Sequence, residues 1–310
     1  MYIFASRISS ELVPFLEKYL SGRVHSVFES ALNIETDSGE MITILAAQRD
    51  LQPMSIQIKL DDLYELNAGQ DSVVSAKVGV VSIYGVNRSI TIDTTDAAQI
   101  CLEMRLECAK HGLSGEDYAK RLDVIASAIG GASELRESIA PILCGMFEGL
   151  PFTAPQNVYC VFLSERVREL YAALISHDAA DYTHIGRRIA GCGVGLTPSS
   201  DDFICGVFAA LYASAEVGAL ERITAQNICL ELAKGAASET TAISASFIRN
   251  AAQGCFCESM LRLTRVFFSS KPIGLYDSAV RVCELGSTSG LDTLSGLWFG
   301  LAAARKMNSL

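Results

Sequence analysis

Basic residues are scarce in this sequence and never gather into a run. Of its 310 residues, 25 are Lys or Arg and 35 are Asp or Glu, so the formal net charge is −10. A surface that binds nucleic acid needs clustered Lys and Arg to neutralise phosphates. The sequence therefore argues against nucleic acid as the main partner.

Long apolar runs free of charge are also missing. The longest apolar stretch, 203–220, carries Glu216 and directly follows Asp201 and Asp202. A membrane-spanning helix needs about 20 predominantly apolar residues, so we expect no membrane span. The amino-terminal residues lack a charged segment followed by an apolar core, so we expect no signal peptide and a cytoplasmic protein.

Spaced cysteine and histidine motifs are absent as well. The ten cysteines contain no CxxC pattern, their closest pair is Cys255 and Cys257, and the four histidines form no HxH or HxxxH pattern. Zinc sites need such spacings, so the sequence argues against a zinc site, and we predict no bound cofactor. In a protein that is not exported, the cysteines should be reduced thiols.

The chain has enough apolar material for two domains. Half of its residues are hydrophobic, and its length is about twice that of a common domain. Residues 1–95 are rich in short strand patterns, and 37–40 has the composition of a hairpin turn. This spacing predicts a small barrel or sandwich. The expected strands are 31–36, 41–45, 55–60, a β-rich run over 73–84, and 89–93, with a short strand or helix in 1–19.

Residues 96–310 follow a mainly helical pattern, so the predicted fold class is α+β. A helix is expected from 95 to 111, and Ser114 with Asp117 resembles a capping box at the start of the next helix. Further helices are expected at 133–147, 161–176, 180–190, 198–217, 221–237, 239–252, 255–268, 274–285 and 291–305.

The segment 191–202, GCGVGLTPSSDD, carries the strongest indication of a site. Its alternate glycines leave the backbone free to turn and to expose its N–H groups. Thr197 is expected to cap a helix that has Pro198 at its first position. Free N–H groups, the helix dipole and the nearby hydroxyls would together cradle an anion. The predicted anion-binding residues here are Gly193, Gly195, Thr197, Ser199 and Ser200.

Known phosphate-binding loops differ from this segment. A P-loop has a Lys before its Ser or Thr, and that Lys is missing here. A dinucleotide-binding turn follows a strand, whereas a helix is expected before this loop. The plainer alternative is a glycine-rich connection with a well-capped helix and no ligand.

Two adjacent carboxylates open the helix that follows the glycines. Asp201 and Asp202 begin an otherwise apolar helix, so one of them must lie near apolar surface, where an unpaired carboxylate is costly. Carboxylates beside an anion cradle also repel the anion. Either Mg²⁺ bridges the charges, or the carboxylates accept hydrogen bonds from an amide or amine of the ligand. We predict a catalytic role for both residues.

Two later segments repeat parts of this design. Thr241 and Ser244 fall on one helix face, and hydrogen bonds to their own preceding turn are the alternative to a binding role. The loop 286–292 is rich in glycine and hydroxyl groups and leads into another apolar helix. Its candidates are Ser289 and Gly290 for binding and Asp292 for catalysis. If the two helix starts converge, they would hold one small polar ligand between them.

Three motifs of this chain together resemble the AllH family: GCGVGLTPSSDDF, ETTAISASFIRNAAQG and LGSTSGLDTLSGL, in this order. The resemblance covers most of the chain and implies a subunit of an oxamate carbamoyltransferase with partner subunits. Such an enzyme exchanges a carbamoyl group between carbamoyl phosphate and oxamate, and so makes or consumes oxalurate in purine (allantoin) breakdown. Three positions depart from the family pattern. Ser200 stands where the pattern usually has Gly, Val194 where it often has Pro, and Thr288 where it has Ser. The Ser200 side chain would narrow the cradle.

The reaction implied by this resemblance needs an anion held by N–H donors, a polarised carbonyl and a positioned amide. The glycine loop and its hydroxyls would hold phosphate or the substrate carboxylate. Asp201 or Asp202 would accept a hydrogen bond from the substrate N–H or act as a general base, and 286–292 would close the other side. Arg187, with its neighbour Arg188, is the expected cation.

Two other functions fit the same residues. The chain could be a non-catalytic binding or scaffold subunit, because its sequence shows no unambiguous Arg or Lys clamp for phosphate. It could instead be a Mg²⁺-dependent phosphotransfer or nucleotide-binding enzyme that uses Asp201 and Asp202. Turnover by the purified chain, and stabilisation by Mg²⁺ with a nucleotide, separate these functions from carbamoyl transfer.

Overall fold

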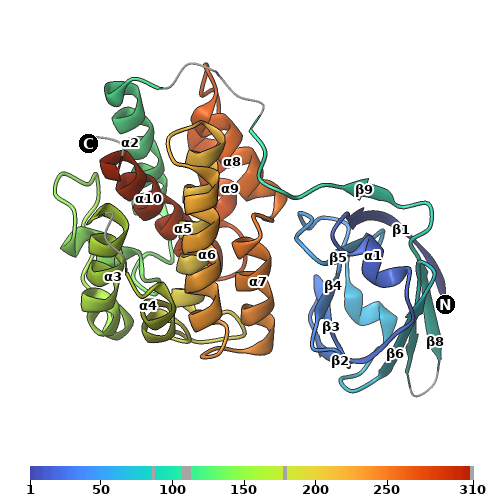
Figure 1. Cartoon of the computed structure of the whole chain (residues 1–310). Helices are drawn as coiled ribbons and strands as arrows, with labels where there is room; N and C mark the ends of the chain where they lie inside the picture. The colour runs from blue at the N-terminus through green and yellow to red at the C-terminus, as the bar shows by residue number, and fades with distance from the viewer. Residues whose placement is uncertain (86–87, 107–112, 177–179, 308–310) are drawn as a thin grey trace. The chain divides into compact units, whose positions relative to one another are not determined.

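The chain divides into two compact units in the computed structural model, 1–102 and 103–310, and each is described by itself. Strands, drawn in blue to teal in Figure 1, make up most of the first unit, and helices make up most of the second. This is the α+β fold that the sequence predicts. The structure describes residues 1–85, 88–106, 113–176 and 180–307.

The first unit is an eight-stranded β-barrel with one added strand. The strands are β1 (Tyr2–Ser9), β2 (Leu20–Val27), β3 (Ala31–Thr36), β4 (Met41–Leu45), β5 (Ser55–Ile58), β6 (Val73–Lys77), β7 (Val80–Tyr84), β8 (Ser89–Asp93) and β9 (Ala98–Ile100). Neighbours follow the order β5-β4-β3-β2-β6-β7-β8-β1-β9, and an antiparallel pairing of β1 with β5 closes the barrel. Two short helices, α1 (Val13–Leu16) and η1 (Leu63–Leu66), belong to the same unit.

Alternating apolar side chains fill the barrel interior. In β3, for example, Leu32 and Ile34 are fully buried in the apolar core. Strands β3 and β4 form the hairpin predicted around 37–40, and Gly39 in its turn has a φ of +85°. Because side chains alternate between the two faces of a strand, the apolar pattern fixes which residues point inward.

The helix expected at 95–111 is wrong at its start. Residues Ala98–Ile100 form β9 instead. Strand β8 pairs with β1 only from Tyr2 to Phe4, and β9 continues this parallel pairing from Arg7 onward. The last part of β1 has backbone N–H and C=O groups that need partners, so residues 98–100 form a strand beside it. This pairing outweighs the weak helix preference of these residues. The end of that prediction, 107–112, lies outside the described residues.

The second unit is built from helices. They are α2 (Gly115–Gly131), η2 (Ala140–Gly145), α3 (Val158–Ser176), α4 (Tyr182–Ile189), α5 (Ser199–Glu216), α6 (Arg222–Ala236), α7 (Ala242–Ala252), α8 (Glu258–Phe268), α9 (Leu275–Cys283) and α10 (Ser289–Met307). Ser114 caps α2 as predicted, because its Oγ accepts a hydrogen bond from the N–H of Asp117 at 3.1 Å. The helix expected at 133–147 is wrong, since this stretch holds turns and the short 3-10 helix η2.

Helices α5 and α10 pack side by side in this unit. A Cβ on Gly296 of α10 would lie 1.9 Å from the carbonyl oxygen of Phe203 in α5, and one on Gly300 would lie 3.2 Å from that of Val207. Contacts that advance by four residues along both helices mean that the helices run parallel. Their amino-terminal ends therefore lie together. Among the described residues, no helix combines the length and the apolar character needed to cross a membrane.

Candidate functional site

The glycine loop, 190–198, joins α4 to α5 and folds back on the first turn of α5. The N–H of Ser200 donates to the carbonyl oxygen of Cys192 at 3.0 Å, and the N–H of Cys192 donates to Ser200 Oγ at 2.9 Å. Gly193 has a φ of +139°, and a Cβ there would lie 2.4 Å from the backbone N of Ser199. The Ser200 side chain, predicted to bind the anion, is fully buried and fastens the loop to the helix.

Substituting Gly193 with Ala should therefore open this loop. The new Cβ meets backbone atoms that cannot yield cheaply, so we expect a loss of about 2–3 kcal/mol in the free energy of unfolding. The matched control is Gly115→Ala in the first turn of α2, where the nearest atom to a Cβ is 3.9 Å away. Urea denaturation of both variants checks the prediction, and equal effects would show that the loop backbone can adapt.

The buried carboxylate of Asp201 accepts hydrogen bonds from the glycine loop, from α5 and from the segment 239–246. It is 1 % exposed, and its Oδ1 accepts hydrogen bonds from the N–H of Gly191 at 2.7 Å and from Ser200 Oγ at 3.3 Å. Its Oδ2 accepts from the hydroxyls of Ser244, at 2.7 Å, and Thr240. Both oxygens are occupied, so this arrangement favours a positioning role over contact with a substrate.

The hydroxyl-rich segment 239–246 supports the glycine loop. Thr241 caps α7 by accepting from the N–H of Ser244 at 3.1 Å, and it donates to the carbonyl oxygen of Leu196 at 2.5 Å. Thr241 and Ser244 therefore contact the loop and Asp201. Thr240 was not predicted from the sequence, although it stands in the same run of hydroxyl residues.

A pair of hydroxyls joins the starts of α5 and α10. Oγ1 of Thr197 lies 2.9 Å from Oγ of Ser289 in a hydrogen bond that links positions 92 residues apart. Thr197 was expected to cap α5, but Pro198 takes the N-cap position and the helix begins at Ser199. Both hydroxyl residues are partly exposed, so a ligand arriving from solvent can reach them.

Two buried carboxylates accompany this hydroxyl pair. Asp202 is 9 % exposed and Asp292 is fully buried. Oδ1 of Asp292 accepts a hydrogen bond from the N–H of Ile139 at 2.8 Å. Among the described residues, Oδ2 of Asp202 and Oδ2 of Asp292 are buried and have no hydrogen-bond partner; we call these two atoms the open oxygens. A buried carboxylate oxygen without a donor is costly, so the open oxygens are candidates to accept hydrogen bonds from a ligand.

Burial raises the pKa of both carboxyl groups. For Asp202 the pKa lies well above its usual range because of burial; the Ser289 hydroxyl lowers it and the neighbouring carboxylates raise it further. For Asp292 burial raises the pKa to about 7, against the opposing effects of the Ile139 N–H and the Ser199 hydroxyl. A carboxyl group with a pKa near neutrality can accept and return a proton under physiological conditions.

The other predicted residues are spread more widely. Gly195 and Arg187 are exposed. Gly290 is buried against the end of α9, where a Cβ would lie 1.9 Å from the carbonyl oxygen of Val282, so this glycine serves close packing. Over the described ranges, no group of three or more His, Cys, Asp or Glu side chains is placed to hold a metal ion.

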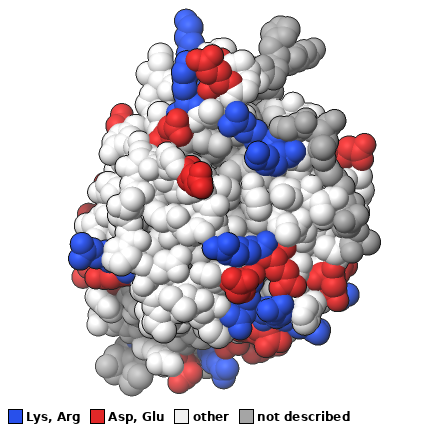
Figure 2. Space-filling model, turned by 90° about the vertical axis from the view of Figure 1, so that its left-hand side faces the viewer, with Lys and Arg blue, Asp and Glu red and all other residues white. Residues whose placement is uncertain are grey.

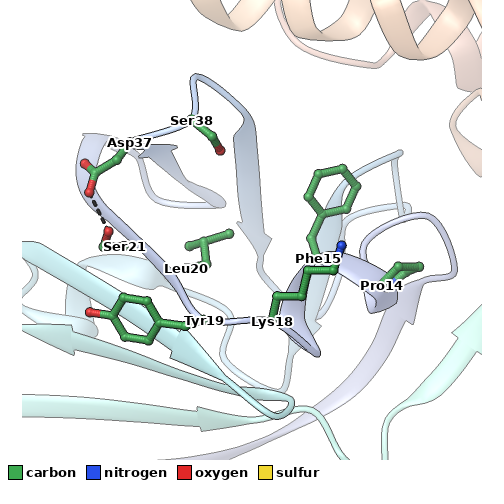
Figure 3. Close-up of a pocket in the computed structure, with 8 residues that line it drawn as sticks. All are labelled: Pro14, Phe15, Lys18, Tyr19, Leu20, Ser21, Asp37 and Ser38. Carbon is green, nitrogen blue, oxygen red and sulfur yellow. Dashed lines mark hydrogen bonds between the residues drawn. The ribbon is translucent and has the colours of Figure 1, made fainter.

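Surface charge forms no single-sign patch among the described residues on the face that Figure 2 shows. Figure 2 shows basic and acidic side chains interspersed on one face of the molecule. A cavity of about 570 Å³ on the first unit is lined by residues of α1 and its surroundings, including Phe15, Lys18 and Tyr19 (Figure 3). Its acidic member, Asp37, already accepts a hydrogen bond from Ser21 at 2.5 Å, so we assign no chemistry to this cavity.

Comparison with known families matches both units. The family model described as "Oxamate carbamoyltransferase subunit AllH" matches residues 189–301, which hold the glycine loop, Asp202 and Asp292. The model described as "AllH family N-terminal domain" matches residues 4–99, which form the barrel. No solved structure matches the chain. The chain therefore belongs to the AllH family, which is named for a subunit of a carbamoyltransferase.

Proposed function

We propose that the starts of α5 and α10 bind a small, negatively charged amide or carbamoyl compound, and that this chain is a substrate-binding subunit of a carbamoyltransferase. The candidate ligands are carbamoyl phosphate, oxamate and oxalurate. The pair of open oxygens beside two parallel helix starts is the observation that carries the proposal. The family name supports the reaction class.

The site combines two opposite kinds of group. The two helix starts provide partial positive charge, and the hydroxyls of Thr197, Ser199 and Ser289 provide donors; both suit an anion. The open oxygens accept hydrogen bonds and repel an anion when their carboxyl groups are ionised. A simple anion satisfies only the donors. A ligand with an anionic group at one end and N–H groups at the other satisfies both, and all three candidate ligands have this composition.

Carbamoyl transfer also uses a group that can take up a proton. The amide nitrogen of oxamate attacks the carbamoyl carbon, a C–N bond forms, and the C–O bond to phosphate breaks as phosphate leaves. The nitrogen must lose one proton during this step. Asp202 or Asp292 accepts it in our proposal, because each has an open oxygen and a raised pKa. Asp201 then positions the loop and takes no part in proton transfer.

The test compares oxamate with oxalate, in which a second carboxylate replaces the amide. Titration calorimetry of the purified chain should show binding of oxamate and much weaker binding of oxalate, which has no N–H. Asp202→Asn should lower the affinity for oxamate about tenfold or more, because the NH₂ group of the new Asn faces the N–H of the ligand. The same variant should bind inorganic phosphate equally well, since the hydroxyls of Thr197 and Ser289 and the two helix starts are unchanged. The control is Asp277→Asn, an exposed first-turn Asp of α9.

Other outcomes assign other functions. Binding of oxamate without turnover, in the presence of the partner subunits, would leave a binding or scaffold subunit. Stabilisation by Mg²⁺ with ATP, but not by oxamate or carbamoyl phosphate, would favour the phosphotransfer alternative. Equal affinity of the wild-type chain for oxalate and oxamate would remove the open oxygens from ligand recognition.

A further inference from the structure

An anion at the glycine loop needs a full positive charge nearby. Each helix start supplies only about half a charge, and the same first turns carry the carboxyl groups of Asp202 and Asp292. The cations expected from the sequence do not meet this need. Arg187 is exposed, and Arg188 forms an ion pair with Glu169 of α3.

That ion pair places one face of α3 beside the end of α4, where the glycine loop begins. Arg166 lies three residues before Glu169 and therefore on the same face of α3. The charge of Arg166 acts on the loop itself. Burial raises the pKa of the Cys192 thiol in the loop, and the guanidinium of Arg166 acts in the opposite direction.

The guanidinium of Arg166 is held in place before any ligand binds. It stacks over the ring of Phe162 with its Cζ 3.8 Å from the ring centre, and its Nη1 donates to the Phe162 carbonyl oxygen. Its Nε is buried and has no partner in the part of the chain that the structure describes. A planar guanidinium with a free buried N–H suits the paired oxygens of a carboxylate or phosphate.

We propose that Arg166 binds the anionic group, carboxylate or phosphate, of the ligand held at the glycine loop. This inference rests on the proposed function and divides the ligand between two parts of the site. Arg166 and the helix starts recognise the anionic end, and the open oxygens recognise the N–H end. Arg166 then selects charged amides over neutral ones.

Two probes that differ in one charged group test this division. Oxamate carries a carboxylate and an amide, whereas oxamide carries two amides and no charge. Arg166→Gln should lower the affinity for oxamate about tenfold or more and leave the affinity for oxamide unchanged, so that the preference for oxamate disappears. Asp202→Asn should lower the affinity for both oxamate and oxamide. Arg168→Gln on the same helix is the matched control, because Arg168 is half exposed and bonds to the carbonyl oxygen of Gly145.

The position of Arg166 can be measured without a ligand. Its positive charge favours the thiolate of Cys192, so Arg166→Gln should slow alkylation of Cys192 by neutral iodoacetamide several-fold, as measured by peptide mass spectrometry. Saturating oxamate should protect Cys192 in the wild-type chain and in Arg168→Gln. Unchanged alkylation in Arg166→Gln would place its charge away from the loop and overturn the inference.

The two proposals fail in different ways. If Asp202→Asn no longer binds oxamate and Arg166→Gln binds it as the wild type does, the proposed ligand site stands and the proposed role of Arg166 is wrong. If the wild-type chain binds neither oxamate nor carbamoyl phosphate, alone and with its partner subunits, the proposed function and the inference that rests on it are both wrong. If both amides weaken equally in Arg166→Gln, Arg166 only supports the shape of the site.

Discussion

Replacing Asp292 with Asn should lower the rate of carbamoyl transfer, because one of the two open oxygens is lost, and should at the same time stabilise the folded chain above pH 7. Asn keeps an oxygen for the N–H of Ile139 but cannot ionise. Burial raises the pKa of Asp292 from its ordinary 3.8 to about 7, so the folded state binds this proton more tightly than the unfolded state does. The stability that depends on this group is therefore full below pH 4 and is lost as the pH rises toward 7.

The size of this effect sets the measurement. A pKa change from 3.8 to about 7 corresponds to roughly 4 kcal/mol, which we take as an upper limit. Urea denaturation at about pH 5 and about pH 8 should show that the stability gain of Asp292→Asn over wild type grows with pH. Asp277→Asn, at an exposed position, should show no such growth. A variant that is less stable than wild type at both pH values would mean that the Asp292 carboxylate is well paired when folded.

Replacing Asp201 with Ala should cause the largest loss of folding stability among the site variants. The substitution leaves the N–H of Gly191 and the hydroxyls of Ser200, Ser244 and Thr240 without their acceptor. Removing one partner from a buried charged network costs about 3–5 kcal/mol, because the remaining groups stay desolvated. Oxamate binding should be lost as well, since the loop is no longer held against α5.

A comparison of three variants separates this positioning role from direct contact. Thr240→Val removes one donor to Asp201 and should cost about 1 kcal/mol in the free energy of unfolding, with a small effect on binding. Asp202→Asn should change binding strongly while leaving stability equal or higher. If Asp201→Ala keeps wild-type stability and loses only binding, then Asp201 contacts the ligand and our assignment is wrong.

Much of the fold could be predicted from short-range patterns. The hairpin of β3 and β4 follows from alternating apolar residues on both sides of a turn that contains Gly39. The start of α2 follows from the cap that Ser114 forms with Asp117. These features depend on residues close together in the chain, so the sequence displays them directly. Two expected helices were wrong, because distant partners decide the conformation there. In 95–111, β9 forms by pairing with β1, and in 133–147 the carboxylate of Asp292 accepts a hydrogen bond from the N–H of Ile139 just before η2.

The site shows the same division. The sequence by itself determined its chemical groups: a glycine loop, hydroxyls and first-turn carboxylates at two helix starts, in the order shared by the AllH family. Only the tertiary structure decided their burial and their hydrogen-bond partners. It surrounds Asp201 with donors from three segments, and it leaves the open oxygens of Asp202 and Asp292 without any among the described residues. It also sets α3, which carries Arg166, against the end of α4 through the ion pair of Glu169 with Arg188. The physical reason is that burial and hydrogen-bond partners depend on contacts between residues tens to hundreds of positions apart, which no local pattern specifies.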